Sequence, residues 1–202
     1  MLTIHHLGKS QSERVVWLCE ELGLPYELVR YDREPIGAAP PAYKALHPYG
    51  TAPVITDGDL VLGESGAIIE YLCHMRAEGR LTRGPGDPDY ADYLYWLHFA
   101  NGSMVAGVMM DVVAQRLGTQ PLSNRSDRAY KLADERLASV PFFAGEEFTA
   151  ADIMMGYPII NVTSSMKRDL TPYPHIAAYI EQIGERPAYR RSLAKAEPEM
   201  AA

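Results

Sequence analysis

The spacing of apolar residues changes partway along the chain and divides it into two parts. In the first part, residues 2–7 predict a short strand, a helix follows that ends at Gly23, and residues 26–31 predict a second strand. A strand, a helix and a strand in that order imply a right-handed parallel crossover. A short helix is expected next, over residues 41–46.

A hairpin is predicted after that helix. Two β-rich runs, residues 54–56 and 60–62, flank Asp57-Gly58, a dipeptide that strongly favours a tight turn. Pro53 cannot donate a hydrogen bond to a sheet, so it must lie at the edge or at the start of the first strand. We therefore expect two antiparallel strands with a proline at their head.

A helix begins directly after the hairpin. It runs from Glu64 to about Glu78, because the apolar residues there have helical spacing. Glu64 and Ser65 lie at its amino end, where unpaired backbone amides and the helix dipole favour anions. The resulting order of elements, βαβαββα, is that of an α/β thioredoxin-like fold.

Strand patterns are absent from the second part of the chain. Residues 81–88 concentrate glycine and proline and are interpreted as a linker, so we predict a thioredoxin-like domain at 1–80 and an all-α helical domain at 89–202. The features expected in the helical domain are a long helix over residues 89–117 with a bend at Asn101-Gly102, a second helix at 124–140, and a capping box from Thr149 to Asp152. Tyr157-Pro158 predicts a kink near Gly156, and final helices are expected at 173–183 and 187–196.

Composition narrows the possible functions. The 202 residues are 47% hydrophobic and 22% charged, as in ordinary soluble proteins, and the formal net charge is −7. No block of lysine and arginine stands out, so neither nucleic acid nor an anionic membrane is an expected partner. The sequence has no run of 18 apolar residues, no secretion signal and only two cysteines. We therefore expect a cytoplasmic protein without a membrane span.

Two motifs resemble the glutathione-binding half of the cytosolic glutathione transferases. They are the strand-opening proline in GTAPVI and, eleven residues later, the acid-serine pair in ESGAI. The resemblance implies a cis Ala52-Pro53 bond and a backbone contact from Ala52 to the cysteinyl part of glutathione. It also implies that Glu64 and Ser65 hold the γ-glutamyl end. The alternative is a plain hairpin followed by a capped helix.

One position departs from the family pattern. Relatives commonly have lysine or glutamine two residues before the proline, where it contacts the glycine end of glutathione, and this sequence has Thr51. Threonine forms hydrogen bonds but brings no charge to meet a carboxylate. Lys44, Arg33 or His47 could supply that charge.

The loop between the first strand and the first helix is where the chemistry is expected. Its residues Ser10-Gln11-Ser12-Glu13-Arg14 resemble the loop of bacterial, theta-like and delta-like members, in which a serine donates its hydroxyl to the glutathione sulfur. The resemblance implies that Ser10 is the catalytic residue, with Ser12 as the alternative. The non-catalytic role of either serine is to cap the helix.

The energies involved are sufficient for a serine to activate a thiol. Lowering a thiol pKa by about two takes ~2.7 kcal/mol of preferential stabilisation of the anion. One hydroxyl donor to a charged acceptor contributes about 1.5–3 kcal/mol, and the amino end of a helix adds ~0.3–1 kcal/mol.

Cysteine and histidine residues offer no competing site. Cys19 and Cys73 both lie among apolar residues of predicted helices, so we expect buried structural thiols rather than a cysteine that forms mixed disulfides. His5 and His6 occupy adjacent strand positions and face opposite sides of the sheet. We expect no metal site and no cofactor, with glutathione as a co-substrate.

The acceptor site and the subunit contact are expected in the second part of the chain. The resemblance implies an apolar pocket lined by the long helix. Its candidate residues are Met104, Val105, Val108 and Met109, with core packing as the alternative role. Relatives are usually homodimers, and Asn101 occupies a position from which some relatives reach the partner subunit's glutathione.

These interpretations favour an enzyme, a glutathione transferase that activates the glutathione thiol and adds it to small electrophilic apolar substrates. A non-catalytic protein with the glutathione-binding fold, acting as a binding or interaction module, is one alternative. A glutathione-dependent disulfide or peroxide reductase is another.

Overall fold

The computed structural model describes residues 1–120 and 123–198. The described chain separates into two compact units, here called unit 1 (Met1–Arg80 with the segment from Glu185 onward) and unit 2 (Leu81–Gly184). The sequence pattern assigns all of residues 89–202 to one helical domain. The structure differs, because the last helix packs against the first helix of unit 1.

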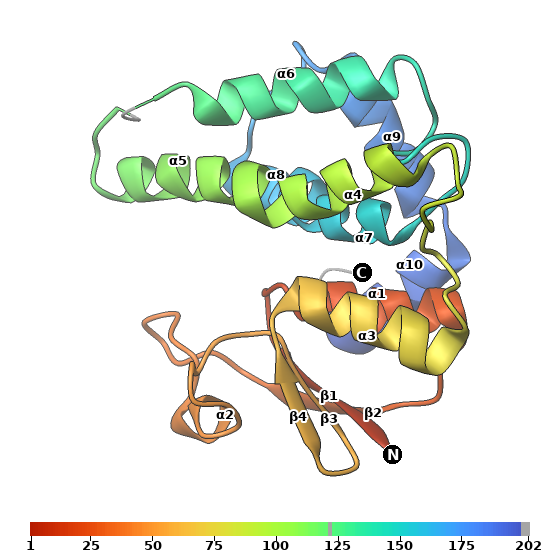
Figure 1. Cartoon of the computed structure of the whole chain (residues 1–202). Helices are drawn as coiled ribbons and strands as arrows, with labels where there is room; N and C mark the ends of the chain where they lie inside the picture. Colours follow the sequence, from red (N-terminus) through yellow and green to blue (C-terminus); the bar gives the residue numbers. More distant parts are fainter. Residues whose placement is uncertain (121–122, 199–202) are drawn as a thin grey trace. The chain divides into compact units, whose positions relative to one another are not determined.

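Unit 1 is built on a sheet that contains four strands in the described part of the chain. They are β1 (Leu2–Leu7), β2 (Glu27–Tyr31), β3 (Val54–Asp57) and β4 (Leu60–Gly63), in the order β2-β1-β3-β4 (Figure 1). β1 is parallel to β2 and antiparallel to β3, and β3 pairs with β4 as a hairpin. The predicted crossover and hairpin are confirmed, and with them the thioredoxin-like fold.

The helices of unit 1 are α1 (Glu13–Leu22), α2 (Pro41–Lys44), α3 (Ser65–Ala77) and α10 (Pro187–Ala196). α1 and α3 lie on one face of the sheet (Figure 1). α2 lies against the other face, where Tyr43 packs with Leu7 and Val54. Since successive strand residues point to opposite faces, His5 lies on the side of α2 and His6 lies on the side of α1.

Polar and aromatic contacts fasten α10 to α1. Glu20 of α1 accepts a hydrogen bond from Arg191 Nε at 2.9 Å and another from the ammonium group of Lys195. Trp17 and Tyr189 pack edge to face, with ring centroids 4.9 Å apart. These partners explain why the last helix belongs to unit 1, although its amphipathic sequence is typical of a helical domain.

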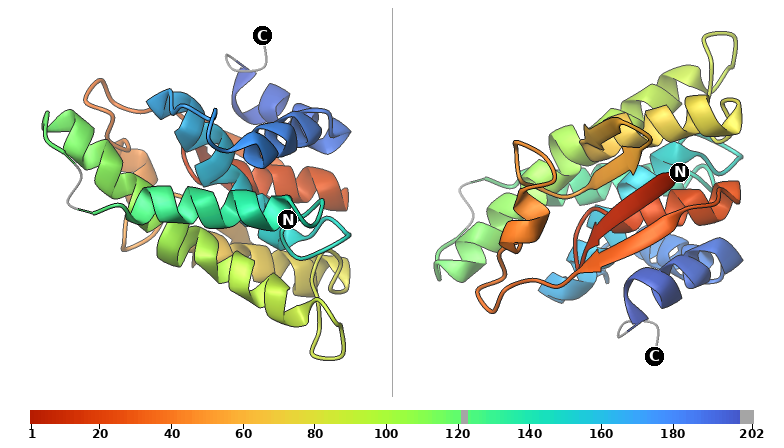
Figure 2. Two further views of the ribbon diagram at one scale, coloured as in Figure 1. Left: turned by 90° about the horizontal axis from the view of Figure 1, so that it is seen from above. Right: turned by 90° about the horizontal axis from the view of Figure 1, so that it is seen from below.

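Unit 2 is helical in the part that the structure describes. Its elements are α4 (Tyr90–Phe99), η1 (Ala100–Val105), α5 (Ala106–Arg116), α6 (Arg125–Leu137), α7 (Ala150–Gly156), η2 (Tyr157–Val162), α8 (Thr163–Met166) and α9 (Pro174–Gly184). α6 packs alongside α5 (Figure 2, left). The predicted all-α character of this part is confirmed.

The interruptions expected in the long helices take the form of π-helical segments. η1 contains Asn101-Gly102, where the sequence predicts a bend, and η2 begins directly after Gly156, near which the sequence predicts a kink. In both places the chain remains helical with a wider turn. Pro158 has no amide proton, so one helical hydrogen bond is missing, and its ring needs additional space. The wider π turn accommodates both effects.

The predicted capping box is present at the start of α7. The backbone amide of Thr149 donates to Oδ2 of Asp152 at 2.8 Å. The other carboxylate oxygen accepts hydrogen bonds from Phe143 N at 2.9 Å and from the Tyr179 hydroxyl at 3.0 Å. Burial raises the pKa of Asp152 to about 6, and the hydrogen bonds act in the opposite direction. Asp152 therefore joins a loop, α7 and α9 within unit 2.

The stretch Tyr90–Leu117 is long enough to span a membrane and contains an 18-residue window with a mean hydropathy of 1.3. Its apolar character is an average, because no 18 consecutive residues in it are apolar. Core helices of soluble proteins have the same properties. Here α4 packs against α7, and its Trp96 and Leu97 are buried within unit 2. We therefore interpret this stretch as a core helix.

Candidate functional site

The loop between β1 and α1 holds two buried serine hydroxyls. Ser10 Oγ donates to the Leu7 carbonyl at 2.6 Å and lies 2.8 Å from Ser12 Oγ. Ser12 directly precedes α1, but among the described residues its side chain caps no helix amide. Its hydroxyl accepts a hydrogen bond from Leu7 N at 3.1 Å instead. The side-chain capping role predicted for Ser12 is therefore wrong.

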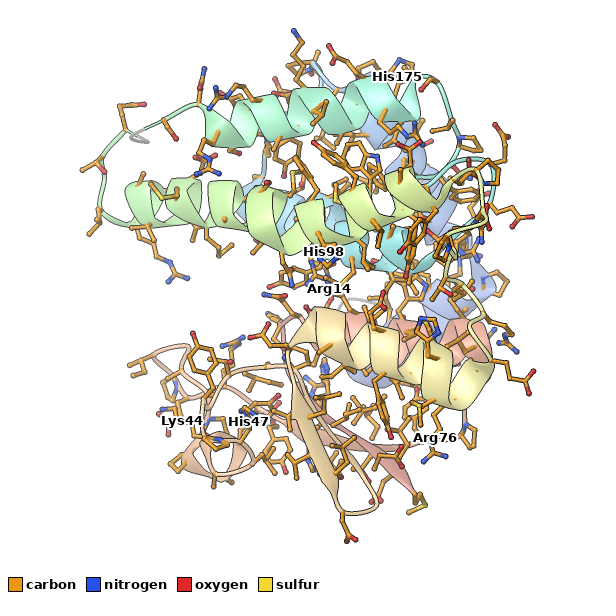
Figure 3. The ribbon with its side chains drawn as sticks, in the orientation of Figure 1. Arg14, Lys44, His47, Arg76, His98 and His175 are labelled. Carbon is orange, nitrogen blue, oxygen red and sulfur yellow. The ribbon has the colours of Figure 1, made fainter. Side chains whose placement is uncertain are left out.

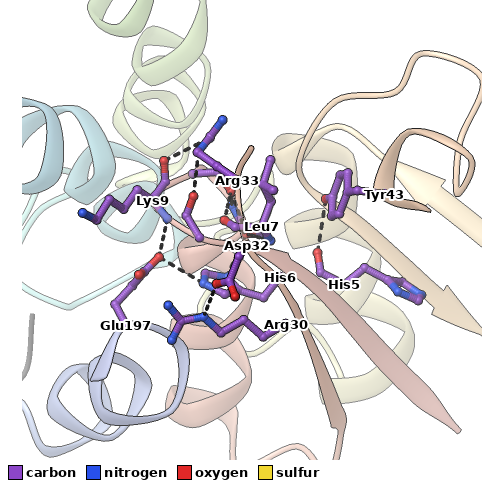
Figure 4. A network of polar contacts seen from close by, with 12 residues as sticks. His5, His6, Leu7, Lys9, Arg30, Asp32, Arg33, Tyr43 and Glu197 are labelled. Carbon is purple, nitrogen blue, oxygen red and sulfur yellow. Dashed lines mark hydrogen bonds and ion pairs between the residues drawn. The ribbon is translucent and has the colours of Figure 1, made fainter. Parts of the chain in front are cut away.

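Ser12 connects this loop to a histidine and a glutamate. Ser12 Oγ lies 2.9 Å from Nδ1 of His6, and Nε2 of His6 lies 3.1 Å from Oε1 of Glu197, just after α10 (Figure 4). Glu197 also accepts a hydrogen bond from the backbone amide of Lys9. Burial alone would raise the pKa of Glu197, but the hydrogen bonds from His6 and Lys9 bring it below its ordinary value. The buried carboxylate is therefore ionised at neutral pH.

A buried arginine joins the same loop to the start of α3. Arg14, labelled in Figure 3, is 1% exposed, and its Nη1 donates to Ser65 Oγ at 3.0 Å and to the Gln11 side-chain oxygen. Ser65 also donates to that Gln11 oxygen, at 3.3 Å. A buried charge is stable only with such partners. The result is a fixed position for Ser65 relative to the first loop.

The segment that leads into β3 contains the cis bond that the resemblance implies. The Ala52-Pro53 bond is cis. Pro53 is buried, Ala52 is half-buried and Thr51 is exposed. Glu64 is exposed at the amino end of α3 with a φ of +67°. Residues other than glycine rarely adopt such a φ, and the cost is on the order of 1–3 kcal/mol.

The basic residues near Thr51 differ in what they contact. Arg33 donates to three backbone carbonyls in the loops of unit 1 and so holds those loops together. Lys44 packs beside Gly50, and a Cβ added to that glycine would lie 3.6 Å from the Lys44 side chain. Lys44 is the last residue of α2, and Figure 3 shows His47 close to the same helix. Lys44 and His47 are therefore better placed than Arg33 to meet a charge near Thr51.

Both cysteines are buried in unit 1 and are not disulfide-bonded. Burial raises the pKa of Cys19 to about 12, and it raises the pKa of Cys73 to about 12 as well. The thiolate is the reactive form of cysteine, so neither side chain is suited to nucleophilic chemistry. Across residues 1–120 and 123–198, no group of three or more His, Cys, Asp or Glu side chains could hold a metal ion.

The four residues expected to line a second pocket do not lie together. Met104 and Val108 are buried in unit 2 at 0% and 1% exposure, and Val105 is half-buried. Met109 is exposed and lines an apolar cavity of about 470 Å³ along α5. Of these four residues, all described by the structure, Met109 alone lines that cavity. Asn101 is half-buried in η1.

Sequence reasoning missed His6 and Glu197 as parts of this site. It considered His6 only as a metal ligand, and Glu197 lies 191 residues away from it. A histidine on the buried face of a strand needs a hydrogen-bonding partner. The position of His6 in a predicted strand was therefore a signal that such a partner exists. Nothing in the local sequence marks Glu197 as the partner.

Comparisons with known proteins agree along the whole chain. Residues 10–75 match the family model described as glutathione S-transferase, N-terminal domain, and residues 110–182 match the C-terminal domain of the same description. The chain is 35% identical to glutathione S-transferase 3 from Schizosaccharomyces pombe, over 98% of this chain and 88% of that relative. It is 31% identical to glutathione S-transferase GstB from Escherichia coli, over 95% of this chain and 97% of that relative. A solved glutathione S-transferase from Actinobacillus pleuropneumoniae has a TM-score of 0.85 and 35% identity, and the match covers 98% of this chain and 93% of that structure.

Proposed function

Because the chain belongs to the glutathione S-transferase family, we propose that it activates the thiol of glutathione and transfers it to small apolar electrophiles. The observation that carries this proposal is the first loop of unit 1, where the buried Ser10 hydroxyl lies in the loop that Arg14 ties to Ser65. In this proposal Ser10 donates a hydrogen bond to the sulfur, and the backbone of Ala52 pairs with the cysteinyl unit beside the cis Pro53 bond.

The chemistry depends on the ionisation of the sulfur. A free thiol with a pKa near about 8.5 is mostly protonated at neutral pH, and only the thiolate attacks. A hydroxyl that donates to a charged acceptor stabilises the anion more than the neutral thiol. Ser10 Oγ donates to the Leu7 carbonyl, and in the complex a hydrogen bond from Ser10 Oγ to the sulfur replaces that one.

The other end of glutathione carries a carboxylate and an ammonium group. The unpaired amides at the amino end of α3, with Ser65, suit the γ-glutamyl carboxylate. The exposed Glu64 carboxylate suits the ammonium group. At the glycine end, the Thr51 hydroxyl forms a hydrogen bond while Lys44 or His47 supplies the positive charge.

The electrophile is assigned to unit 2. The cavity along α5, at about 470 Å³, has the size of a small-molecule site, which is roughly 300–1,000 Å³. Met109 lines it with a flexible apolar side chain that adapts to varied substrates. In this proposal Met104, Val105 and Val108 support the helix from within, and Met109 is the one of these four candidates that contacts substrate.

We extend the proposal to assembly and location. The protein acts as a cytoplasmic homodimer, as is usual in this family, and its role is detoxification. Asn101 is the residue of η1 assigned to the contact with the partner subunit's glutathione. Sedimentation of the purified protein at micromolar concentration tests the dimer directly, since a single monomeric species would contradict it.

Titration calorimetry with glutathione, followed by conjugation of a chloronitrobenzene, tests the proposed function. The wild type should bind and conjugate. The variant Ser65→Ala should bind roughly 10–150-fold more weakly, because a hydrogen bond to a charged group contributes about 1.5–3 kcal/mol. Ser192→Ala removes another buried hydroxyl of unit 1, one that donates to the Tyr189 carbonyl at 2.7 Å, and should bind like the wild type.

The same assays separate the alternatives. A wild type that binds glutathione but conjugates nothing in a broad panel of electrophiles would be a binding protein. Turnover of hydroxyethyl disulfide or cumene hydroperoxide in place of conjugation would indicate a reductase. If neither calorimetry nor kinetics detects glutathione, the proposed function is wrong.

A further inference from the structure

A continuous line of hydrogen bonds leaves the first loop and ends at a buried carboxylate. Ser10 Oγ lies 2.8 Å from Ser12 Oγ, which lies 2.9 Å from Nδ1 of His6. Nε2 of His6 lies 3.1 Å from Oε1 of Glu197 (Figure 4). All four side chains are at most 4% exposed. This line is therefore continuous and shielded from bulk water.

The partners of His6 define the direction of the line. Glu197 is an acceptor only, so it fixes a proton on Nε2 of His6 and leaves Nδ1 as a lone pair that faces Ser12. This is the arrangement in which an acid orients a histidine and the histidine takes a proton from a hydroxyl. The hydroxyls of Ser10 and Ser12 each carry one proton and cannot serve as the final base themselves.

On the premise of the proposed function, we propose that His6 accepts the thiol proton of glutathione through Ser10 and Ser12. The S–H bond breaks and its proton goes to Ser10 Oγ. The Ser10 proton, which is directed to the Leu7 carbonyl without glutathione, turns to Ser12 Oγ and moves to it, and the Ser12 proton moves to Nδ1 of His6. The products are a thiolate that accepts a hydrogen bond from Ser10 and an imidazolium paired with Glu197, so atoms and charges balance.

The other charged groups near His6 and Glu197 are directed to partners of their own. Arg30 of β2 faces the pair and is itself 3.4 Å from Asp32. On the side of α1, the Arg14 guanidinium is directed to Gln11 and Ser65. On α10, the Lys195 ammonium group donates a hydrogen bond to Glu20. Glu197 is thus the carboxylate in hydrogen-bond contact with the imidazole.

His6 acts on glutathione only through the serines, so it is a positioning and proton-accepting residue rather than one that touches substrate. A purely structural clamp between the C-terminal segment and the first loop would show the same distances. The two roles differ in where the thiol proton goes. In the relay it stays on the protein, and in the clamp it is released to solvent.

A proton count on the wild type distinguishes the two roles. Thiolate formation on binding is measured by its ultraviolet absorbance, and proton release is measured by calorimetry in buffers of different ionisation enthalpy at neutral pH. The relay predicts clearly fewer protons released than thiolates formed. One proton released for each thiolate overturns the relay and leaves the proposed function intact. A wild type that binds glutathione without forming thiolate overturns both.

Variants provide a second, independent test. His6→Gln keeps hydrogen-bonding groups but cannot take the proton, and Glu197→Gln removes the charge that stabilises the imidazolium. Each should raise the thiol pKa of bound glutathione by about one, a tenfold smaller thiolate population at a given pH. The control is His74→Gln, since His74 belongs to an exposed pair with Glu70 on α3, 3.7 Å apart, and should titrate as the wild type does. Folded His6→Gln with the wild-type thiol pKa contradicts the relay.

Discussion

Replacing Ser10 by alanine tests the proposed activation of the thiol, and the structure sets the size of the effect. A hydrogen bond from the hydroxyl to a thiolate contributes about 1.5–3 kcal/mol, but the same hydroxyl now makes a neutral bond to the Leu7 carbonyl, with a net contribution of about 0.5–1.5 kcal/mol. Only the difference of roughly 1–1.5 kcal/mol favours the thiolate. Since ~1.4 kcal/mol corresponds to a factor of ten, Ser10→Ala should raise the thiol pKa of bound glutathione by about one.

The assay is the pH dependence of kcat/KM for chloronitrobenzene conjugation. At pH values below the wild-type thiol pKa, Ser10→Ala should be about tenfold slower, and at high pH the two rates should converge. Ser192→Ala is a closely matched control, because Ser192 and Ser10 are both 4% exposed and both donate to the carbonyl three residues earlier. A Ser10→Ala profile that overlies the wild-type profile refutes the role of Ser10. A loss confined to Ser12→Ala would assign the role to Ser12.

Other predictions concern the stability of each unit, measured by urea denaturation. Asp152→Ala leaves buried donors of three segments without an acceptor and should lower the free energy of unfolding by about 3 kcal/mol. A loss below about 1 kcal/mol would contradict the role of Asp152 in joining these segments. Burial alone would raise the pKa of Glu20, but hydrogen bonds from basic residues of α10 and from a tyrosine bring it below 4.5. The stability that Glu20 contributes is therefore complete above that pH and is lost as the pH falls through the lowered folded-state pKa. The difference between wild type and Glu20→Gln should shrink on acidification, and a constant difference would refute this linkage. Gly145→Ala places a Cβ 2.7 Å from the Asp89 carboxylate at a φ of +154° and should cost roughly 1–3 kcal/mol. Gly184→Ala, with no atom within 4 Å of the added Cβ, should cost nothing, and equal losses in the two variants would contradict the steric argument.

Local signals in the sequence were sufficient to predict the elements of unit 1. Gly23 ends α1 in the left-handed conformation, with a φ of +64°. Gly58 turns the hairpin with a φ of +60°, the region that a tight two-residue turn requires. The capping box at Thr149 and Asp152 is also a local signal and is present. Such features depend on neighbouring residues, which the sequence displays directly.

The features that sequence reasoning missed depend on contacts between distant residues. The position of α10 in unit 1 depends on the side chains that meet Glu20 across more than 170 positions. For Met104 and Val108 the sequence left pocket lining and core packing open, and the structure buries both side chains. Which role applies depends on the phase of a helix that passes through the π turns of η1, which shifts the face that later residues present. The contact of His6 with Glu197 has no local signature at all.

The most direct test of the central claim is a crystal structure of the protein with glutathione bound. The account predicts that the sulfur lies within hydrogen-bonding distance of Ser10 Oγ, that the cysteinyl backbone pairs with Ala52, and that the γ-glutamyl carboxylate meets Ser65 at the start of α3. Glutathione bound elsewhere, or held in unit 1 with its sulfur directed away from Ser10, would contradict it.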